Sequence, residues 1–372
     1  MKKINHLIVG CGISGIVIAE QIATKLKEKV LIIEKRKHIG GNCYDYEKDG
    51  ILIQKYGPHI FHTQEKYVWE YLSQFTKWYY YRHKVNAKID KKDINLPFNI
   101  NSLYALFEYQ DAKRYEDILK RHFSTSFASI SELLSHENID IKELASIIFS
   151  KIFYGYSLKQ WGQDPNTLSK NILSRLPIRL TKDDDYFSDK YQGIPLEGYT
   201  KMFERMLDNP LIEIKLGTNY NDIKHNVDFN HLFYTGSLDE LFDYQNGILP
   251  YRSLKIKFQK ILKKEVQKVA CVNYPNHFKF TRITEYKKFL DTKADYSIIS
   301  KEYPNKFIKD KNERFYPINT EENNSMYKKY KEKIIENKIH LLGRLGDYKY
   351  YDMDKAVLRA LQLFKEVYHE RL

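Results

Sequence analysis

Two histidines lie three residues apart in the segment YGPHIFHT, residues 56–63. They are His59 and His62, and a pair at this spacing could bind a metal ion or exchange protons with a substrate. A metal site would need a third and a fourth ligand, and the sequence offers no cluster of His, Cys or Asp to supply them. We therefore expect no metal here, and we interpret His62 as a structural hydrogen-bonding residue.

The three cysteines also offer little chemistry. Cys11, Cys43 and Cys271 are far apart and form no CxxC pair, so we expect neither a disulfide framework nor a zinc site, and we expect a reducing compartment. The first residues, MKKINHLIVG, reach a glycine too early for a signal peptide, and no apolar run approaches 18 residues. The expectation is a cytoplasmic protein with no segment inserted in a membrane.

A glycine-rich turn near the N-terminus has the spacing of a dinucleotide site. Gly10, Gly12 and Gly15 form G-x-G-x-x-G after a short apolar strand and at the start of a helix. In such a motif the first glycine makes the turn, the second lets the backbone approach a pyrophosphate, and the third lets helix and strand pack closely. The second strand, residues 30–33, leads to Glu34, which can accept hydrogen bonds from ribose hydroxyls. Together with the N–H groups at the helix start, these parts predict dinucleotide binding.

The residues after Glu34 indicate which dinucleotide is bound. The segment RKHIGGNCY places Gly40 and Gly41 directly beyond the acidic end of the strand. This arrangement resembles the FAD-binding half of the glutathione-reductase-like flavoproteins, in which a second glycine pair passes close to the cofactor. Residues 339–368 then predict a strand, a glycine turn and a long amphipathic helix with Asp354 as its N-cap. In such flavoproteins this helix directs its N-terminus at the flavin.

Between these two ends the hydrophobic pattern changes twice. Apolar residues recur at helical spacing from residue 101 to about residue 160, and strand-like segments return from about residue 186. We predict an α/β protein with a Rossmann-type FAD-binding domain of the glutathione-reductase-like kind, a helical insertion domain and an antiparallel β-sheet domain. The expected boundaries are 1–80, 200–245 and 318–372 for the FAD-binding domain, 100–170 for the helical domain, 81–99, 186–199 and 246–317 for the sheet domain, and 171–187 for a mobile active-site lid.

The net charge of +13 leaves a second class of function open. A basic protein can meet nucleic acid, a membrane or a phosphorylated small molecule. The lysines of residues 255–268 alternate with apolar residues, as on the solvent face of a strand, and no arginine-rich arm stands apart from them. Nucleic-acid binding is therefore the weaker alternative. The 31 tyrosines would suit a site for sugars or bases, although most of them must serve in packing.

Several longer motifs resemble those of the bacterial UDP-galactopyranose mutases, from the first strand to the last helix. Besides residues 56–63, they are FYGYSLKQWG (153–162), SRLPIRLTKDDDYF (174–187), FTRITEYK (280–287), FYPI (315–318) and GRLGDYKYYDMD (343–354). The resemblance implies a flavoprotein isomerase, an intramolecular transferase that interconverts UDP-galactopyranose and UDP-galactofuranose. Such an enzyme supplies galactofuranose for cell-surface polysaccharides.

The resemblance also implies a mechanism. N5 of reduced FAD attacks the anomeric carbon, UDP leaves, and the sugar ring contracts through an iminium intermediate before UDP returns. A cofactor that acts as the nucleophile explains why the sequence has no Ser–His–Asp spacing and no plausible catalytic cysteine. An external reductant for FAD and a homodimer are expected on the same basis.

Two arginines are implied as ligands of the diphosphate. Arg175 on the lid and Arg282 on the sheet domain match the family motifs, and a guanidinium group can pair with two phosphate oxygens and keeps its charge. Arg179, four residues further along, is the alternative to Arg175 on the lid. With His59, which is expected beside the flavin to tune its environment, Arg175 and Arg282 form the predicted catalytic set.

The remaining site residues follow from the same match. The predicted substrate-binding residues are His83, Phe153, Tyr156, Ser157, Trp161, Arg175, Tyr186, Asn273, Arg282, Tyr316 and Tyr350, with Asn86 as the alternative to His83. The predicted cofactor-binding residues are Gly10, Gly12, Ser14, Gly15, Glu34, Lys35, Gly41, Asn42, His59, Ile60, Gly343, Arg344, Tyr350, Asp352 and Met353.

Other functions remain as alternatives. The same chemistry could act on UDP-N-acetylgalactosamine, because the substituent at C2 differs by only a few atoms. A flavin-dependent oxidoreductase acting on an amine or a sugar would share the cofactor, but it would not need two arginines on a diphosphate.

Overall fold

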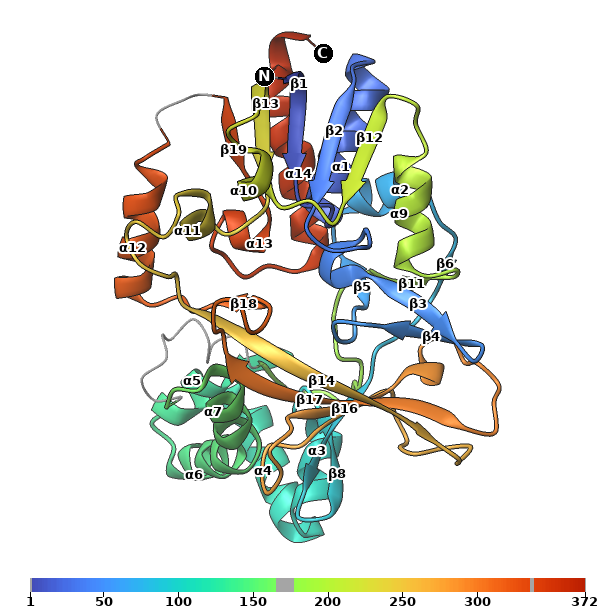
Figure 1. Ribbon diagram of the computed structural model, residues 1–372. Coiled ribbons are helices and arrows are strands. Elements are labelled where there is room, and N and C mark those ends of the chain that lie inside the picture. The colour runs from blue at the N-terminus through green and yellow to red at the C-terminus, as the bar shows by residue number, and fades with distance from the viewer. Residues whose placement is uncertain (1, 165–176, 335–337, 372) are drawn as a thin grey trace. The chain divides into compact units, whose positions relative to one another are not determined.

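The computed structural model describes residues 2–164, 177–334 and 338–371 (Figure 1). The chain divides into two compact units, each assembled from segments that are distant in the sequence. Unit 1 consists of Met1–Tyr80, Asp189–Arg252 and Phe307–Leu372, and unit 2 consists of Tyr81–Ser188 and Ser253–Lys306. In the part of the chain that the structure describes, no helix has both the length and the apolar composition needed to cross a membrane.

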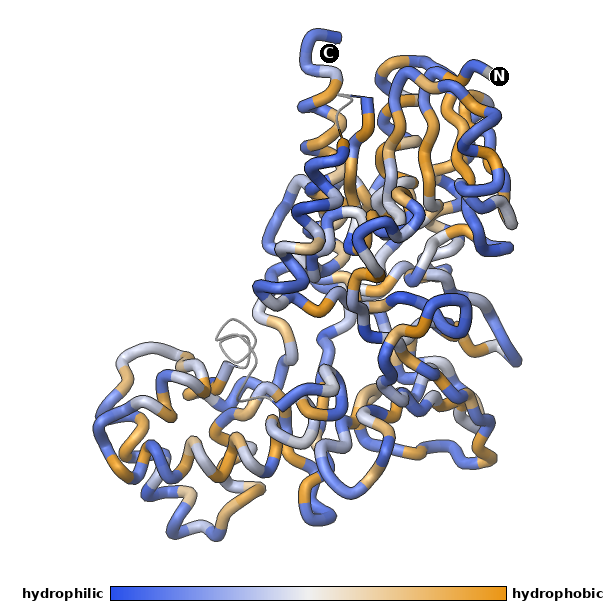
Figure 2. Tube along the Cα trace, turned by 60° about the vertical axis from the view of Figure 1, so that its left-hand side comes forward, coloured by the Kyte–Doolittle hydropathy of each residue, from blue (hydrophilic) through white to orange (hydrophobic). Residues whose placement is uncertain are grey.

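A five-stranded parallel sheet forms the centre of unit 1, in the order β12-β2-β1-β13-β19. The inner strands contain runs of Ile, Leu and Val that are buried on both faces, as expected for a parallel sheet covered by helices. Figure 2 shows these strands as largely orange segments near the N-terminus. The strands are β1 (Lys2–Val9), β2 (Val30–Glu34), β12 (Ile212–Leu216), β13 (Val227–Tyr234) and β19 (Ile339–Leu341).

Helices cover this sheet on two sides because successive strand residues point to opposite faces. Ile8 and Phe233 join the larger core with α1, α9 and α14, whereas Leu7 joins a second core with α10. The helices of unit 1 are α1 (Ile13–Gln21), which continues as a π-helical turn (Ile22–Leu26), α2 (Lys66–Ser73), α9 (Tyr199–Leu207), α10 (Tyr220–Ile223), α11 (Leu238–Leu241), α12 (Glu321–Lys331), α13 (Gly343–Gly346) and α14 (Met353–Tyr368).

Helix α14 begins at Met353, and its N-cap differs from the one that the sequence predicts. Asp352 is the N-cap residue, so the prediction of Asp354 as N-cap is wrong. Asp354 instead lies in the first turn, where its buried carboxylate accepts a hydrogen bond of 3.0 Å from Thr63 Oγ1. The carboxylate therefore fastens the start of the helix to a neighbouring strand.

The smaller sheets of unit 1 include a segment that the sequence groups with the antiparallel sheet domain. β11 (Tyr191–Pro195) pairs with β5 (Phe61–Thr63) and β6 (Trp78–Tyr79), so residues from Asp189 onward belong to unit 1. The remaining strands here are the hairpin of β3 (Asp45–Lys48) and β4 (Ile51–Gln54), and β18 (Tyr316–Pro317), which pairs with the first two residues of β14 (Tyr251–Ile261).

Unit 2 combines a mostly antiparallel sheet with a group of helices. Its strands follow the order β14-β17-β16-β15-β7-β8. The pairing of β7 with β15 is parallel, and these strands come from two separate chain segments. The strands are β7 (Val85–Ile89), β8 (Lys92–Leu96), β15 (Cys271–Asn273), β16 (Arg282–Glu285) and β17 (Ser297–Lys306), with a separate pair of β9 (Phe127–Ser129) and β10 (Pro177–Arg179).

In the part of unit 2 that the structure describes, the α-helices lie between residues 100 and 161, in the region where the sequence predicts helical structure. Two of them begin with capping boxes, at Asn99 and at Ser129, in which the side chain and the backbone exchange hydrogen bonds with the third helical residue. The helices are α3 (Ile100–Leu106), α4 (Tyr109–His122), α5 (Ile130–Ser135), α6 (Ile139–Ile148), a π-helical segment (Phe149–Tyr154) and α7 (Gly155–Trp161).

Candidate active site

The glycine-rich turn of unit 1 packs closely against its neighbours on two sides. Gly10 has a φ of +100°, and a Cβ atom there would lie 2.0 Å from Thr235 Oγ1. A Cβ on Gly15 would lie 2.2 Å from the carbonyl oxygen of Gly10. A Cβ on Gly12, by contrast, would meet no atom closer than Cα of Gly41 at 3.9 Å. The backbone is therefore open at Gly12, where a phosphate can approach it.

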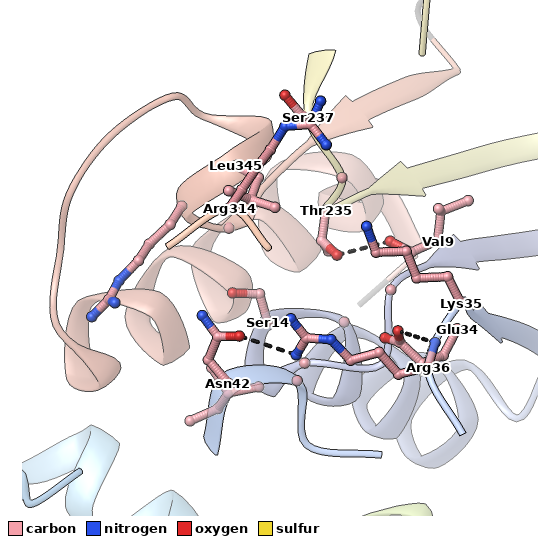
Figure 3. Close-up of a pocket in the computed structure, with 18 of the residues that line it drawn as sticks. Val9, Ser14, Glu34, Lys35, Arg36, Asn42, Thr235, Ser237, Arg314 and Leu345 are labelled. Atoms are coloured by element: carbon pink, nitrogen blue, oxygen red, sulfur yellow. Dashed lines mark hydrogen bonds between the residues drawn. The ribbon is translucent and has the colours of Figure 1, made fainter. Parts of the chain in front are cut away.

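A cavity lies at this turn (Figure 3). Its empty volume, which includes the space at the open mouth, is about 1250 Å³. All of the predicted cofactor-binding residues except Ile60 and Tyr350 line it. The cavity is formed by the ends of β1, β2 and β13, the starts of α1 and α14, and residues 313–315 and 343–345. Segments far apart in the sequence thus meet at the carboxyl edge of the parallel sheet, where ligands of such sheets bind.

Glu34 lies in this cavity at the end of β2 and is buried. Its carboxylate accepts hydrogen bonds of 2.9 Å from the backbone N–H of Cys11 and of 2.9 Å from that of Arg36. The side chain of Arg36 crosses to Asn42, donating to Oδ1 at 3.0 Å (Figure 3). It also forms an ion pair of 3.0 Å with Glu313. Arg36 was not among the predicted site residues.

The cavity fits a dinucleotide such as FAD. The N-terminus of α1 has no side-chain cap, so N–H groups of its first turn are available to a pyrophosphate. The absence of a Cβ at Gly12 leaves room for close approach, and each oxygen of Glu34 retains a lone pair for a ribose hydroxyl. The N-terminus of α14 faces the same cavity through Asp352 and Met353.

His59 lines the cavity with a fixed backbone. Its N–H donates to Gln54 Oε1 at 2.6 Å, and its carbonyl accepts from Gln54 Nε2 and from the hydroxyl of Tyr199. Burial, together with the charge of Arg344, lowers the pKa of His59 to about 4. The imidazole is therefore neutral at pH 7, and Nδ1 donates to the carbonyl of Gly57 at 2.8 Å because a carbonyl can only accept. Nε2 is then the nitrogen without a proton.

His62 does not share this environment. Its Nδ1 forms a contact of 2.7 Å with Asp189, and its strand β5 pairs with β11. His62 thus joins two segments of unit 1 through a hydrogen bond, while His59 alone of the two lines the cavity.

Arg344 lies near the rings of two predicted substrate-binding tyrosines. Its guanidinium lies 4.9 Å from the ring centroid of Tyr350 and 6.0 Å from that of Tyr316. Nε of Arg344 donates to the carbonyl of Tyr351 at 2.7 Å, which holds the side chain at the cavity wall. Tyr350 is therefore adjacent to the cavity without lining it, and Arg344 is a fixed cation at the wall.

A second cluster, in unit 2, surrounds Arg282 on β16. Its Nε donates to Asn273 Oδ1 at 3.0 Å, and Nη2 donates to the hydroxyl of Tyr156 at 3.1 Å. Nη1 lies 4.0 Å from the buried carboxylate of Glu302 on β17. Three segments of unit 2 thus bring three predicted substrate-binding residues together, and Glu302 is a fourth member that the sequence did not indicate. We call these four residues the Arg282 cluster.

The cluster holds a charged guanidinium that is half-buried beside a buried carboxylate. Burial alone would lower the pKa of Arg282, but the neighbouring Tyr156 and the carboxylate of Glu302 raise it above its usual range. Burial raises the pKa of Glu302, and the positive charge of Arg282 counteracts part of this rise. Oε1 of Glu302 has no hydrogen-bond partner among the described residues. Arg282 therefore stays positive and is only partly neutralised, as a site for a phosphate requires.

The other predicted residues of unit 2 lie near Tyr156 or around His83. Phe153 and Ser157 are buried within one turn of Tyr156, and Trp161 is the last residue of α7. His83 is buried, and its backbone carbonyl accepts a hydrogen bond of 2.6 Å from the N–H of Tyr186. The alternative residue Asn86 is buried on β7, which pairs with the strand of Asn273.

Lys159 is a further residue of this region that the sequence did not indicate. Its ammonium donates to the carbonyls of Tyr274, Phe278 and Phe280 at 2.5–3.4 Å. These carbonyls belong to the loop that joins Asn273 to Arg282. Helix α7, which carries Tyr156, is therefore tied to the loop between the other members of the Arg282 cluster.

Of the two arginines considered for the lid, the structure describes only Arg179. Arg175 lies outside the described residues, as does the first part of the predicted lid. Arg179 is buried on β10, pairs with Asp183 at 2.5 Å, and donates its backbone N–H to the carbonyl of Phe98. Arg179 therefore has a structural environment within unit 2.

The matching family model and the sequence relatives indicate the same family. Residues 151–350 match the family model of UDP-galactopyranose mutase, and residues 8–75 match a model of the NAD(P)-binding Rossmann-like domain. The chain is 38% identical to UDP-galactopyranose mutase of Mycoplasma genitalium, covering 97% of this chain and 94% of that protein. It is also 35% identical to dTDP-fucopyranose mutase of Escherichia coli, over 97% of each chain.

Solved structures agree in fold. A crystal structure of reduced UDP-galactopyranose mutase superposes with a TM-score of 0.76 at 15% identity, covering 99% of this chain and 94% of that one. A protoporphyrinogen oxidase homologue from Exiguobacterium reaches 0.64 at 12% identity, over 100% and 99% of the two chains. The matches confirm the predicted α/β fold class, the prediction of an enzyme and FAD as the cofactor. The chain belongs to the UDP-galactopyranose mutase family.

Proposed function

We propose that this chain interconverts UDP-galactopyranose and UDP-galactofuranose. The observation that carries this substrate is the half-buried, partly neutralised Arg282 beside Tyr156 and Asn273, in a family whose members include mutases of nucleotide-linked sugars. A diphosphate needs a fixed cation, and a nucleobase or sugar needs flat aromatic faces and hydrogen-bond donors. The cluster offers each of these.

FAD is proposed to bind in the cavity of unit 1 through the first turn of α1, Gly12, Glu34 and the start of α14. When bound in its reduced form, FAD supplies the nucleophile for the anomeric carbon of the sugar. The lining residues would hold this cofactor and would provide Arg344 as a nearby cation. Ile60 and Tyr350 do not line the cavity, and they are proposed to lie next to its wall, close to the cofactor.

Arg282 is proposed to hold the diphosphate while the bond to the sugar breaks and re-forms. Tyr156 would contact the uracil with Phe153 and Ser157, and Asn273 would orient the nucleotide. Arg175 is proposed as the second diphosphate ligand, with Trp161, Tyr186, Tyr316, Tyr350 and His83 as further contacts. A guanidinium group stays charged through the whole cycle, so the leaving UDP can be retained for its return.

His59 is proposed to act as a hydrogen-bond acceptor beside the flavin and the sugar. Its Nδ1 is occupied by the carbonyl of Gly57, which leaves Nε2 to accept a hydrogen bond. A pKa of about 4 means that it does not act as a general acid at neutral pH. We further propose a cytoplasmic homodimer whose FAD is reduced by an external electron donor.

The test is a chromatographic assay of the reduced, FAD-loaded protein with UDP-galactofuranose, and in parallel with UDP-N-acetylgalactosamine and dTDP-fucopyranose. We expect conversion of UDP-galactofuranose to UDP-galactopyranose only after reduction, at a higher kcat/KM than with the other nucleotide sugars. Turnover of dTDP-fucopyranose at a higher kcat/KM would reassign the substrate. Oxidation of an amine or a sugar without isomerisation would reject the proposal.

A further inference from the structure

The positive charge of the chain is concentrated in one segment, and apart from Arg282 the proposed catalytic function does not use these charges. Residues 253–306 contain 13 Lys and Arg against 5 Asp and Glu, a net charge of +8 out of +13 for the whole chain. Six of these lysines lie within residues 255–268, in the outer part of β14 and the loop that follows it. We call residues 255–268 the lysine segment.

The lysine segment is exposed and well supported. All six lysines are exposed, and the one acidic residue, Glu265, pairs with Lys288 at 2.5 Å. The loop is fixed from below, because the N–H groups of Val266 and Gln267 donate to the carboxylate of the buried Glu285 at distances of 3.0–3.3 Å. The positive charges are therefore presented on a fixed backbone.

Apolar side chains lie exposed among these lysines. Leu262 is 84% exposed, and Phe258 and Val266 are each 36% exposed. Exposed apolar side chains surrounded by lysines are typical of proteins that lie on an anionic lipid surface, where the apolar groups enter the acyl boundary and the lysines contact the headgroups.

A protective role of the lysines explains only part of this pattern. Beyond Arg252, β14 has β17 as its sole neighbour among the described strands, and lysines on such an edge prevent pairing with another chain. That role does not account for an exposed leucine in the middle of the lysines, since an exposed apolar residue favours association. Nucleic acid is also a poorer fit, because the segment has no arginine and its most exposed apolar residue is aliphatic.

We propose that the lysine segment docks this protein on the surface of a membrane that contains anionic phospholipids. Leu262 inserts at the headgroup boundary, and the neighbouring lysines supply the electrostatic attraction. The contact is peripheral and reversible, and it is independent of the reaction that the enzyme catalyses.

The experiment is sedimentation of the full-length, FAD-loaded protein with vesicles of phosphatidylcholine alone or mixed with phosphatidylglycerol. We expect binding to the mixed vesicles only, and weaker binding as salt is raised. Substituting Lys263→Gln, Lys264→Gln and Lys268→Gln together should reduce this binding by about a hundredfold. A matched control, Lys328→Gln, Lys329→Gln and Lys331→Gln on α12, removes the same charge from exposed positions in unit 1 and should leave binding within a factor of about two.

Further outcomes decide the proposal. Leu262→Ser should weaken the binding that survives at high salt, which a purely electrostatic contact would not show. Absence of binding to mixed vesicles, or equal loss in both triple variants, would overturn the proposal. Tight binding of a uridine oligonucleotide that the Lys263, Lys264 and Lys268 substitutions abolish, without vesicle binding, would assign the segment to nucleic acid instead. Flavin absorbance and mutase turnover of each variant verify that it is folded.

Discussion

The cofactor cavity and the Arg282 cluster are built on different principles. The cavity is formed mainly by backbone at the ends of strands and the starts of helices, with glycines where a side chain would collide. The Arg282 cluster is formed by side chains from one helix and three strands, around one half-buried positive charge. One region depends on backbone conformation and the other on electrostatics, so different substitutions should disable each of them.

The largest effect is expected from Gly15→Val, which tests whether the cavity depends on backbone contact. A Cβ at this position would lie 2.2 Å from the carbonyl oxygen of Gly10, and the backbone cannot move aside as a flexible side chain would. We expect the purified variant to carry no FAD, measured by flavin absorbance, and to have no mutase turnover. A yellow variant with normal turnover would show that the turn tolerates a side chain. Gly217→Asn, where nothing lies within 4 Å of the added Cβ and asparagine tolerates a φ of +66°, is the control for an added side chain.

The next largest effect is expected from Arg282→Ala, which tests the electrostatic region alone. Removing one partner of a buried charge pair costs about 2–5 kcal/mol. We expect kcat/KM for UDP-galactofuranose to fall by about 30-fold or more while the flavin absorbance is retained. Arg175→Ala should behave in the same way if it is the second diphosphate ligand. Arg179→Ala removes an arginine with a structural environment, so it should lower the melting temperature more than it changes KM.

A smaller effect is expected from Lys159→Met, which tests whether α7 positions the loop within the Arg282 cluster. The substitution removes the donor to three carbonyls of the loop between Asn273 and Arg282. Unpaired carbonyls cost about 1–3 kcal/mol, and the loop gains freedom. We expect KM to rise by about tenfold with little change in kcat or FAD content. Lys151→Met, which removes an exposed ion pair with Asp90, should leave KM unchanged. An unchanged KM in Lys159→Met would mean that α7 does not position the loop.

The smallest effect is expected from titration of His59 in the cavity. Its pKa is about 4 in the folded protein against about 6.5 in an unfolded chain, so the unfolded state binds more protons between these values. The stabilising contribution is therefore fully present above pH 6.5 and is lost as the pH falls toward 4. Thermal unfolding of His59→Asn should show a shallower loss of stability over this interval than the wild type. Parallel pH curves for the two proteins would show that His59 is not the group responsible.

The cavity could be predicted from sequence to a large extent because its chemistry lies in local backbone motifs. The glycine spacing, the apolar strand and Glu34 fall within one continuous stretch, and each has a defined task in dinucleotide binding. Arg36 and Arg314 also line the cavity and were missed, because a surface arginine and a cavity arginine look alike in a sequence. Asp354 was misplaced as an N-cap because its bond to Thr63 is a tertiary contact.

The Arg282 cluster could not be predicted from local patterns. Tyr156, Asn273 and Arg282 come from the helical region and the sheet, and only the resemblance to a family identified them as candidates. Glu302 and Lys159 carry no sequence signal, since one lies in a strand among polar residues and the other in a short helix. Their tasks depend on which segments meet in three dimensions. The lysine segment was visible in the sequence, but its exposed Leu262 became clear only in the structure.

In our proposal, unit 1 binds the cofactor while Arg282 in unit 2 holds the nucleotide diphosphate. The most direct measurement is calorimetric titration of UDP into FAD-loaded wild type and Arg282→Ala at equal flavin content. We predict that the Kd for UDP rises by about 30-fold or more in the variant, with no change in bound FAD. Equal affinity of the two proteins for UDP would contradict the account.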